Sequence, residues 1–504
     1  MTKPILDRIH LLFEHRHKLD PNKEFLFTPS RTYTFAEIKV LVDKLEKELL
    51  DNKVIPGDRI LIIAENCPEH IALILACSRV GAWSCGVNAR MSKGEIATYL
   101  KMADPRLIYF TSGVSTAAKQ HASNYPTQTS TLDALSISQS DTPVLPADAD
   151  LIDKIAAIIF TSGTTGASKG VLVSHLGLTH FGRVSAESRD LGPKDKSYAY
   201  LPMTHIFGLG TVLMASLYAG AALILRTQFD PAEAYEALAT GGLTNLQGPS
   251  AMYTRLLDYW EDRHGTEQKP AHPDLRYVYM GASALDYSIK LRVEKFFGFP
   301  LNHGYGLSEY AGAVSVTKNH VWRQDTSSGY LVEGGEVIIV DGDGKELPQG
   351  ERGELWIRGI GLMPGYFRDP EATKHVMRPD GWLATGDIAY FDTDGALFVV
   401  GRLKEMIIRS GFNVYPAEVE AILNSYPGIS QSAVVGKKEL DGNETIIGFV
   451  QLNSEQTLDH DDLKVFLKDR LAPYKLPAQI ITMDKFPLTF SGKILKRELL
   501  QTLS

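Results

Sequence analysis

Cysteine is scarce in this chain: its 504 residues include Cys67, Cys77 and Cys85 and no others. None of the three belongs to a CxxC pair and their number is odd, which argues against a disulfide framework and against a zinc site. We therefore expect buried thiols and a reducing compartment, the cytoplasm. The N-terminal segment MTKPILDRIHLLFEHRHK interrupts every apolar run with charge, so we expect no signal peptide.

A basic excess is missing as well. The chain has 52 Lys and Arg against 60 Asp and Glu, a net charge of −8, which argues against a nucleic-acid-binding protein. Residues 206–225 carry no charge, but Gly208, Gly210 and Gly220 interrupt this run. We expect a buried helix, a turn and a core strand there rather than a segment that spans a membrane.

Helical and strand patterns alternate over most of the chain. Residues 35–51 have helical spacing, and RILIIAEN, RLIYFTS, AAIIFTS and AALIL read as short buried strands. This pattern predicts an α/β fold with parallel sheet. From about Gly335, short strands with turn signals predict a β-rich subdomain. A chain of this length forms two or more domains. We expect a large N-terminal domain of layered α/β subdomains plus the β-rich one (1–400), and a small α+β C-terminal domain (401–504).

The segment Thr161-Ser-Gly-Thr-Thr-Gly-Ala-Ser-Lys-Gly170 follows the predicted strand AAIIF. Glycine lets backbone N–H groups approach a phosphate, hydroxyls donate hydrogen bonds to it, and Lys169 supplies positive charge. The segment lacks the Walker pattern, which needs GxxxxGK followed by Ser or Thr. On composition alone, a flexible surface loop is the alternative.

This segment resembles the phosphate-loop signature of the adenylate-forming superfamily, which includes acyl- and aryl-CoA ligases, luciferases and peptide-synthetase adenylation domains. The commoner form has proline where this chain has Ser168. Further motifs follow in the family's order: LPMTH (201–205) with Phe207-Gly208, YGLSE (305–309), Gly365-Tyr366 with Pro370-Glu371 and Thr373, TGD (385–387), GRLKE (401–405), GFNVYPAEVE (411–420) and SGK (491–493). Taken singly, Glu309 and Asp387 would be surface acids, His205 a partly buried histidine and Lys493 a loop lysine. Their joint order carries the resemblance.

The resemblance implies an acid–thiol ligase, most like an acyl- or aryl-CoA ligase, with ATP, Mg²⁺ and coenzyme A. By resemblance, Thr161, Ser162, Gly163, Thr164, Thr165, Gly166 and Lys169 hold the β- and γ-phosphates, and Glu309 with Thr165 holds Mg²⁺. Tyr305 packs near the adenine beside Gly281, Ala282 and Ser283; Asp387 and Arg402 bind the ribose; Ser308 contacts the α-phosphate. Lys493 reaches the α-phosphate and the acyl oxygen, and His205 completes the catalytic set. The C-terminal domain is implied to rotate about Lys404.

The acyl pocket is expected at the segments that match the family's pocket: His205, Phe207, Gly248, Met252, Gly281, Leu307, Ala311 and Gly312. Since these segments contain no Lys or Arg to pair with a second buried carboxylate, we expect a monocarboxylic acid, aromatic or short to medium aliphatic. We expect a monomer or homodimer that binds the acid and CoA and neither spans a membrane nor binds nucleic acid.

Three alternatives stay open. The acceptor could be the phosphopantetheine of a separate carrier protein. Either CoA phosphates or an acidic carrier could be met by Arg409, Lys437, Lys438, Lys475, Lys496 and Arg497. A non-catalytic nucleotide-binding protein could keep the fold, although Lys493, Asp387 and Glu309 together argue against it. Luciferase-like oxidation shares the same motifs.

Overall fold

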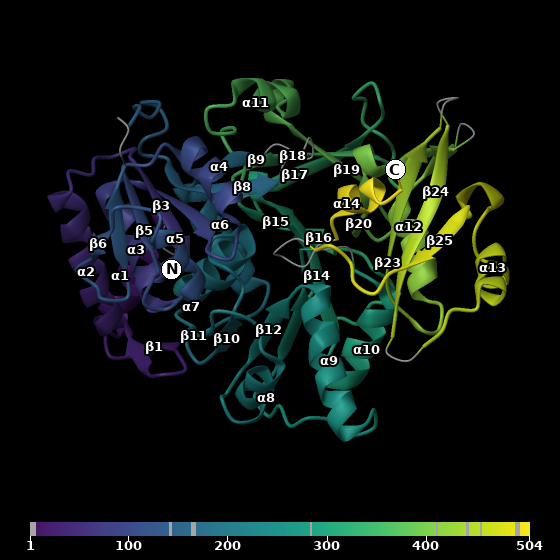
Figure 1. Cartoon of the computed structure of the whole chain (residues 1–504), viewed down its shortest axis with the longest axis horizontal. Helices are drawn as coiled ribbons and strands as arrows, with labels where there is room; N and C mark the ends of the chain where they lie inside the picture. The colour runs from purple at the N-terminus through teal and green to yellow at the C-terminus, as the bar shows by residue number, and fades with distance from the viewer. Residues whose placement is uncertain are drawn as a thin grey trace.

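The structure is a computed structural model that describes residues 7–140, 144–162, 168–282, 285–409, 412–439, 443–453, 456–488 and 494–503. Two large mixed sheets make up most of the molecule, and a smaller antiparallel sheet, the β-rich sheet, joins them to a smaller C-terminal unit (Figure 1). No helix in these described ranges is long and apolar enough to cross a membrane. The uncharged run at 206–225 forms a π-helix (Phe207–Met214), α7 (Ala215–Ala219) and the core strand β11 (Ala222–Leu225), as expected.

The first sheet carries the glycine-rich segment at its edge. Its strand order is β6 (Gln128–Thr129), β7 (Ser136–Gln139), β5 (Leu107–Phe110), β3 (Arg59–Ala64), β4 (Trp83–Asn88), β8 (Ile155–Ser162) and β9 (Ser168–Ser174). Alternate residues of β3 enter two different cores. Ile60 and Ile62 pack with α2 (Phe35–Asp51) and α3 (Pro68–Val80), whereas Leu61 and Ile63 pack with α4 (Lys93–Ala103) and α5 (Thr116–Ala122). The sheet is therefore covered by helices on both faces, which explains why its strands are apolar throughout.

The second sheet carries Tyr305, Gly306 and Leu307 of the YGLSE motif. Its strand order is β16 (Tyr330–Leu331), β15 (Gly312–Val316), β14 (Leu301–Leu307), β13 (Tyr277–Met280), β12 (Asn245–Gly248), β10 (Lys196–Ala199), β11, β1 (Glu24–Phe27) and β2 (Thr32–Thr34). The helices of this part of the chain are α1 (Ile9–Leu19), α6 (His175–Glu187), α8 (Pro231–Ala239), α9 (Ser250–His264) and α10 (Tyr287–Phe297). Asn66 connects the two sheets, because its amide donates to the Leu201 carbonyl (2.9 Å) and accepts from Met203 N (3.0 Å).

The remaining sheets belong to the last third of the chain. An antiparallel sheet joins β17 (Gly335–Val340), β18 (Gly353–Gly359), β19 (Leu383–Phe391) and β20 (Leu397–Arg402), with α11 (Pro370–Val376) between β18 and β19. The C-terminal unit contains β21 (Ile407–Arg409), β22 (Phe412–Val414), α12 (Pro416–Asn424), β23 (Ile429–Lys438), β24 (Glu444–Leu452), α13 (His460–Lys468), β25 (Gln479–Thr482) and α14 (Lys496–Gln501). Its buried side chains form clusters that draw on residues from Ile407 onward.

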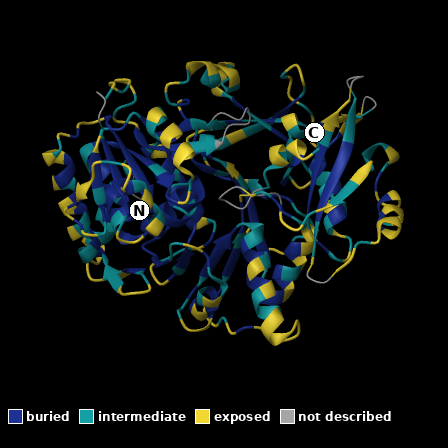
Figure 2. Ribbon diagram, in the orientation of Figure 1, coloured by how far each residue is buried: buried dark blue, intermediate teal, exposed yellow. Residues whose placement is uncertain are grey.

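Local sequence signals fix several helix ends. Thr34 caps α2 by accepting from Glu37 N, and the Glu37 carboxylate accepts from Thr34 N, which completes a capping box. Ser92 and Glu95 form the same arrangement at α4. The outer helices alternate buried and exposed positions, while the central strands are buried along their length (Figure 2). Short-range chemistry thus sets where helices begin, and the apolar pattern sets which face turns inward.

Buried histidines make the folded protein sensitive to acid. Burial lowers the pKa of His70 and His303 to about 4 and that of His175 to about 3, against an ordinary value of 6.5. Between pH 6.5 and 4 the unfolded chain therefore binds protons that the folded chain does not. The stability contributed by the neutral imidazoles is present above pH 6.5 and is lost as the pH falls toward 4.

We predict that His70→Leu makes the free energy of unfolding less dependent on pH in this window, by about 1.4 kcal/mol per pH unit, because leucine takes up no proton. Urea unfolding at pH 7.0, 6.0 and 5.0 measures the slope. His264→Leu, at an exposed site in the last turn of α9, is the control and should leave the slope unchanged. Equal slopes for wild type and His70→Leu would contradict the assignment.

Candidate active site

Asp387 lies where the second sheet meets the β-rich sheet, and both oxygens of its carboxylate have polar partners. Asp387 of β19 is paired with Arg402 of β20 in the strand register, and Arg402 Nε lies 3.2 Å from Asp387 Oδ1. Tyr305 of β14 donates its hydroxyl proton to Asp387 Oδ2 (2.5 Å). Burial, together with the Asp387 charge, raises the pKa of Tyr305 well above its ordinary value, so the phenol stays protonated and remains a donor.

A second carboxylate follows β14 directly. Glu309 lies in the 3-10 turn Ser308–Tyr310, where Ser308 is buried. Tyr366 donates its hydroxyl proton to Glu309 Oε1 (3.0 Å), and the Lys169 ammonium lies 4.6 Å from the centre of the Tyr366 ring. Burial and the Glu309 charge raise the pKa of Tyr366 above its ordinary value, which keeps this phenol protonated too. Tyr366 therefore joins the lysine of the glycine-rich segment to the acid of YGLSE.

Backbone pairing holds Tyr366 in this place. Phe367 N donates to the Gly170 carbonyl (2.7 Å) and Leu172 N donates to the Gly365 carbonyl (3.2 Å). Tyr366 N donates to Thr373 Oγ1 (2.9 Å) at the first turn of α11. The segment that contains Gly365, Tyr366 and Thr373 is thus attached to β9, the strand that carries Lys169.

The glycine-rich segment itself is the connection of a β-hairpin. Thr161 of β8 and Lys169 of β9 are opposite each other in the antiparallel ladder, so the segment leads into a strand and not into a helix. A Walker loop leads into a helix, and the structure agrees with the sequence on this difference. Gly163, Thr164, Thr165 and Gly166, the side chain of Ser162, and also Ser283 and Lys493 lie outside the described residues.

The residues expected around the acyl group are neighbours on the β12–β13 side. Gly281 N donates to the Gly248 carbonyl (3.2 Å). A Cβ added at Gly248 would lie 2.5 Å from Met252 Sδ, and one added at Gly281 would lie 3.3 Å from Phe207 Cζ. Ala282, next to Gly281, has a φ of 68°, which turns the chain sharply after β13. At both positions the absence of a Cβ lets neighbouring side chains approach the backbone more closely than any other residue would allow.

The other expected pocket residues, Leu307, Ala311 and Gly312, come from β14, β15 and the turn between them. Leu307 and Gly312 are opposite each other in the β14–β15 ladder. The Ala311 carbonyl lies 3.5 Å from where a Cβ on Gly210 would be, and Gly210 belongs to the π-helix that begins at Phe207. π-helical turns are rare and occur often at functional sites. His205, Phe207, Gly248, Met252 and Gly281 are thus neighbours, and Ala311 lies near the same π-helix at Gly210.

His205 is neutral in this environment. Burial lowers its pKa to about 4, and its Nδ1 accepts a hydrogen bond from Phe207 N (3.2 Å). An accepting Nδ1 carries no proton, so the proton of the neutral ring lies on Nε2. His205 can therefore donate one hydrogen bond to an oxygen but cannot supply a positive charge near pH 7.

Three aromatic residues that contact these glycines were not among the residues predicted from the sequence. A Cβ at Gly281 would lie 2.9 Å from Tyr279 Cε1, and Cβ atoms at Gly248 and Gly312 would collide with Tyr200 and Phe181. Tyr279 precedes Gly281 by two positions in an apolar run, and alternation along β13 places both on one face. That alternation was the available signal; no comparable signal marked Phe181 on α6.

A buried cation lies behind Tyr279. Arg189 and Tyr279 both line a cavity of about 20 Å³. The Arg189 guanidinium donates to the Ser185 carbonyl (2.8 Å), the Ser185 hydroxyl (2.7 Å) and Gln247 Oε1 (3.5 Å). Burial lowers its pKa from the ordinary value. The matching segments themselves contain no arginine, as expected. Folding nevertheless brings Arg189, from outside these segments, to the same small cavity as Tyr279.

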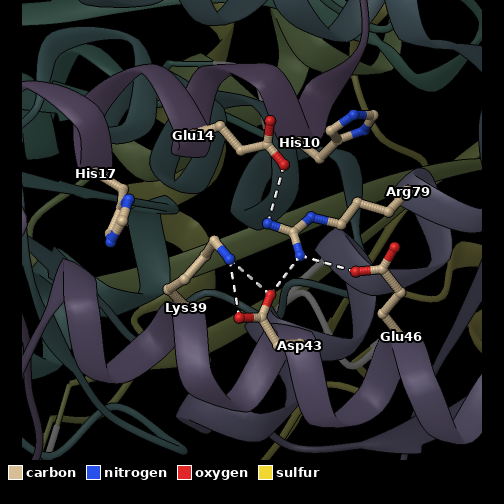
Figure 3. A pocket seen from close by; sticks show the side chains of 7 residues that line it. All are labelled: His10, Glu14, His17, Lys39, Asp43, Glu46 and Arg79. Atoms are coloured by element: carbon tan, nitrogen blue, oxygen red, sulfur yellow. Dashed lines mark hydrogen bonds and ion pairs between the residues drawn. The ribbon is translucent and has the colours of Figure 1, made fainter.

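A wide hollow elsewhere on the surface has a different character. Its volume is about 600 Å³, and it is lined by His10, Glu14, His17, Lys39, Asp43, Glu46 and Arg79 (Figure 3). Arg79 forms ion pairs with Glu14 (2.9 Å), Asp43 (2.7 Å) and Glu46 (2.9 Å). These pairs connect α3 with α1 and α2, so the charges in this hollow hold helices together. None of the motif residues lines it.

Folding thus gives both motif carboxylates, Asp387 and Glu309, a tyrosine partner, and it brings Lys169 to the tyrosine that holds Glu309. Residues 13–367 match the AMP-binding enzyme family and residues 418–493 match the AMP-binding enzyme C-terminal domain. The chain belongs to this family of adenylate-forming enzymes, as its motifs predict.

Relatives and solved structures agree with this assignment. The chain is 31% identical to 4-coumarate–CoA ligase 1 of Solanum tuberosum over 93% of its own length and 88% of the relative's. It is 31% identical to feruloyl-CoA synthase of Amycolatopsis sp over 96% of both chains. ATP-bound MatB from Rhodopseudomonas palustris shares the fold with a TM-score of 0.84 at 26% identity, over 98% of this chain and 99% of that one. Apo MatB, over the same shares, gives 0.76 at 27% identity.

The Tyr305–Asp387 hydrogen bond yields the first prediction for the site. Tyr305→Phe removes the donor that holds the Asp387 carboxylate, and hydrogen bonds to charged groups contribute about 1.5–3 kcal/mol. We expect KM for ATP to rise about tenfold while KM for the acid stays nearly constant. Steady-state kinetics with each substrate varied in turn measures both. Tyr310→Phe, whose hydroxyl binds the Gly334 carbonyl instead, is the matched control and should leave KM for ATP unchanged.

A second prediction concerns the close packing around Gly281. Gly281→Leu adds atoms against Tyr279 and Phe207, and overpacking costs about 1–3 kcal/mol. We expect the acid preference to shift toward smaller acids, with Gly281→Ala intermediate, as measured by AMP release over a panel of acids. Gly94→Leu, where a Cβ meets no atom within 4 Å, is the control. An unchanged acid profile in a folded Gly281→Leu protein would place the pocket elsewhere.

Proposed function

We propose that the protein uses ATP to activate a monocarboxylic acid as an acyl-adenylate and transfers the acyl group to the thiol of coenzyme A, releasing pyrophosphate and AMP. The observation that carries the proposal is the position of the two carboxylates. Tyr305, which anchors Asp387, and Glu309 lie four positions apart at the end of β14. This spacing suits one nucleotide that spans from its ribose at Asp387 to its phosphates at Glu309 and Lys169.

The first half-reaction must bring one anion onto another. A carboxylate oxygen of the acid attacks the α-phosphorus, the bond to the pyrophosphate oxygen breaks, and pyrophosphate leaves. Such transfers depend on positioning and on neutralisation of charge. In our assignment Asp387 binds the ribose hydroxyls with help from Arg402. Tyr305 packs near the adenine beside Gly281, Ala282 and Ser283, and Ser308 donates to the α-phosphate.

In our assignment the phosphates of the nucleotide lie near the side chains of Lys169 and Lys493. Thr161 and Lys169, with the residues between them, hold the β- and γ-phosphates. Lys493 approaches the α-phosphate and the acyl oxygen, where negative charge develops during the attack. The neutral His205 ring borders the acid and offers an Nε2 proton. In the second half-reaction the thiolate attacks the acyl carbon, and AMP leaves as the mixed anhydride bond breaks.

Magnesium fits this site as a partner of the nucleotide. Among the residues that the structure describes, no group of three or more His, Cys, Asp or Glu forms a metal cage, whereas Glu309 offers one carboxylate whose second oxygen is not the one that Tyr366 binds. Mg²⁺ at nucleotide sites typically takes one or two carboxylates together with substrate phosphates. Glu309 and Thr165 would hold it, and when bound it offsets the negative charge of the phosphates.

The acid that we propose is aromatic, with a short or medium aliphatic acid as the second candidate. The aromatic side chains support the first choice, because Phe207 and Tyr279 lie edge to face with centroids 6.0 Å apart and both approach the Gly281 position. The names of the relatives, 4-coumarate–CoA ligase and feruloyl-CoA synthase, support it as well.

The acceptor that we propose is free coenzyme A, and a carrier protein is the alternative. Two of the six basic residues considered for an acidic acceptor are already paired: Lys475 with Glu418 (2.5 Å), and Lys496 with Glu420 (2.7 Å) and Glu405 (3.3 Å). Lys437 and Lys438, at the end of β23, are exposed and suit the phosphates of CoA. Thioester formation with free CoA is the deciding assay. We also propose a cytoplasmic location, in line with three buried free thiols.

We predict that Lys493→Ala abolishes adenylate formation and largely spares thioester formation from supplied acyl-adenylate, because the charge of Lys493 is needed during attack on the α-phosphate. Isotope exchange between pyrophosphate and ATP follows the first half, and CoA consumption follows the second. Lys485→Ala, at an exposed position of the same region, is the control. Equal loss in both halves would overturn the role given to Lys493.

A further inference from the structure

Helix α12 is attached to the large part of the molecule at its first turn. Arg352, which precedes β18, forms an ion pair with Glu418, and Lys475 binds the other oxygen of that carboxylate (2.5 Å). The Arg352 guanidinium also lies 5.4 Å from the ring centre of Tyr390 and 5.7 Å from that of Tyr415. Both distances are within the range of a cation–π contact. Arg352 thus lies between a tyrosine of β19 and a tyrosine that precedes α12.

The last turn of α12 is attached as well. Asn424 donates its amide proton to Asp286 Oδ2 (2.9 Å). The other oxygen of Asp286 caps α10 by accepting from Ser288 N (2.9 Å) and Ile289 N (3.2 Å). One carboxylate therefore serves a helix of the large part and a helix of the C-terminal unit at the same time. Figure 1 shows α12 between the C-terminal sheet and the rest of the molecule.

These contacts are polar and only partly shielded from water. The Arg352 side chain is 41% exposed and that of Glu418 is 21% exposed. Although burial raises the pKa of Glu418, Lys475 and Arg352 outweigh it and leave the pKa below its ordinary value, so the carboxylate is ionised near pH 7. Exposed pairs of this kind contribute little each and weaken with salt. They can hold an arrangement without making it permanent.

The arrangement that they hold resembles the one with nucleotide bound. The chain superposes on ATP-bound MatB with a higher TM-score than on the apo form of the same protein. The contacts of α12 are thus present in a chain that matches the ATP-bound form better than the apo form.

We propose that Arg352 and Asp286 are positioning residues that hold α12, and with it the segment that carries Lys493, in the adenylate-forming arrangement, and that both contacts must open before the thiol can react. This inference rests on the proposed function and on rotation of the C-terminal domain about Lys404. Any such rotation displaces Glu418 and Asn424 relative to Arg352 and Asp286, because they lie on opposite sides of Lys404 in the chain.

The experiment compares the two half-reactions in the full-length enzyme. Arg352→Gln removes the charge and keeps most of the side-chain length, and Asn424→Ala removes the second contact without disturbing the cap of α10. We expect each variant to slow adenylate formation about three- to tenfold while thioester formation from supplied acyl-adenylate is unchanged or faster. Salt at 0.5 M should lower the adenylation rate of wild type toward that of Arg352→Gln and affect the variant much less.

The matched control is Arg358→Gln. Arg358 forms an ion pair with Glu336 (2.7 Å) at similar exposure, 37%, within the sheet that Arg352 borders, but not across the domain boundary. This variant should leave the ratio of the two rates unchanged. Arg352→Lys should restore part of the adenylation rate that Arg352→Gln loses. If Arg352→Gln and Asn424→Ala both slow the two halves by the same factor, or if both match Arg358→Gln, the inference fails. If wild type itself supports neither half with any acid, the proposed function fails instead.

Discussion

The hydrogen bond from Tyr305 to Asp387 joins β14 of the second sheet to β19 of the β-rich sheet, and the remaining parts of the site are placed relative to this junction. Arg402, opposite Asp387 in the strand register, ends β20, and Lys404 follows two residues later. The carboxylate that we assign to the ribose belongs to this strand pair, and the proposed pivot lies just beyond it, in the 3-10 turn Leu403–Glu405. A nucleotide bound at Asp387 would therefore lie close to the segment that we propose to turn.

A tyrosine performs a similar task on the phosphate side. Glu309 and Lys169 come from different sheets, and Tyr366 contacts both, through a hydrogen bond to the acid and a ring face toward the ammonium. Its phenol stays protonated beside Glu309 because burial and the neighbouring negative charge both disfavour the phenolate. Tyr366 thus lies between the carboxylate that we assign to Mg²⁺ and the lysine that we assign to the phosphates.

The contrast between the interior contacts and those of α12 fits an enzyme that changes its arrangement in each turnover. Asp387 is buried and lies opposite Arg402 in the strand register, whereas Arg352, Glu418 and Asn424 meet at a partly exposed boundary. In our proposal the strand register maintains the nucleotide site, and screened contacts permit release of the smaller unit.

Much of the fold could be predicted from the sequence because the signals are short-range. The helix over residues 35–51 and the strands in RILIIAEN, RLIYFTS, AAIIFTS and AALIL are present as expected. The α/β class and the family assignment are confirmed. The domain boundary at residue 400, the hinge at Lys404 and the roles of the site residues stay predictions, among them those of Lys493, Ser283 and the residues between Ser162 and Gly166.

The sequence by itself determined the local elements, the order of the motifs and hence the class of chemistry, because each motif is a run of neighbouring residues whose spacing can be read directly. Tertiary structure alone decided which distant residues meet. Tyr366 beside Glu309, Phe181 against Gly312, Arg189 behind Tyr279 and Arg352 at Glu418 all join positions more than 50 residues apart. Such contacts depend on how whole sheets and helices pack, and packing is set by the summed burial of many side chains rather than by any local pattern.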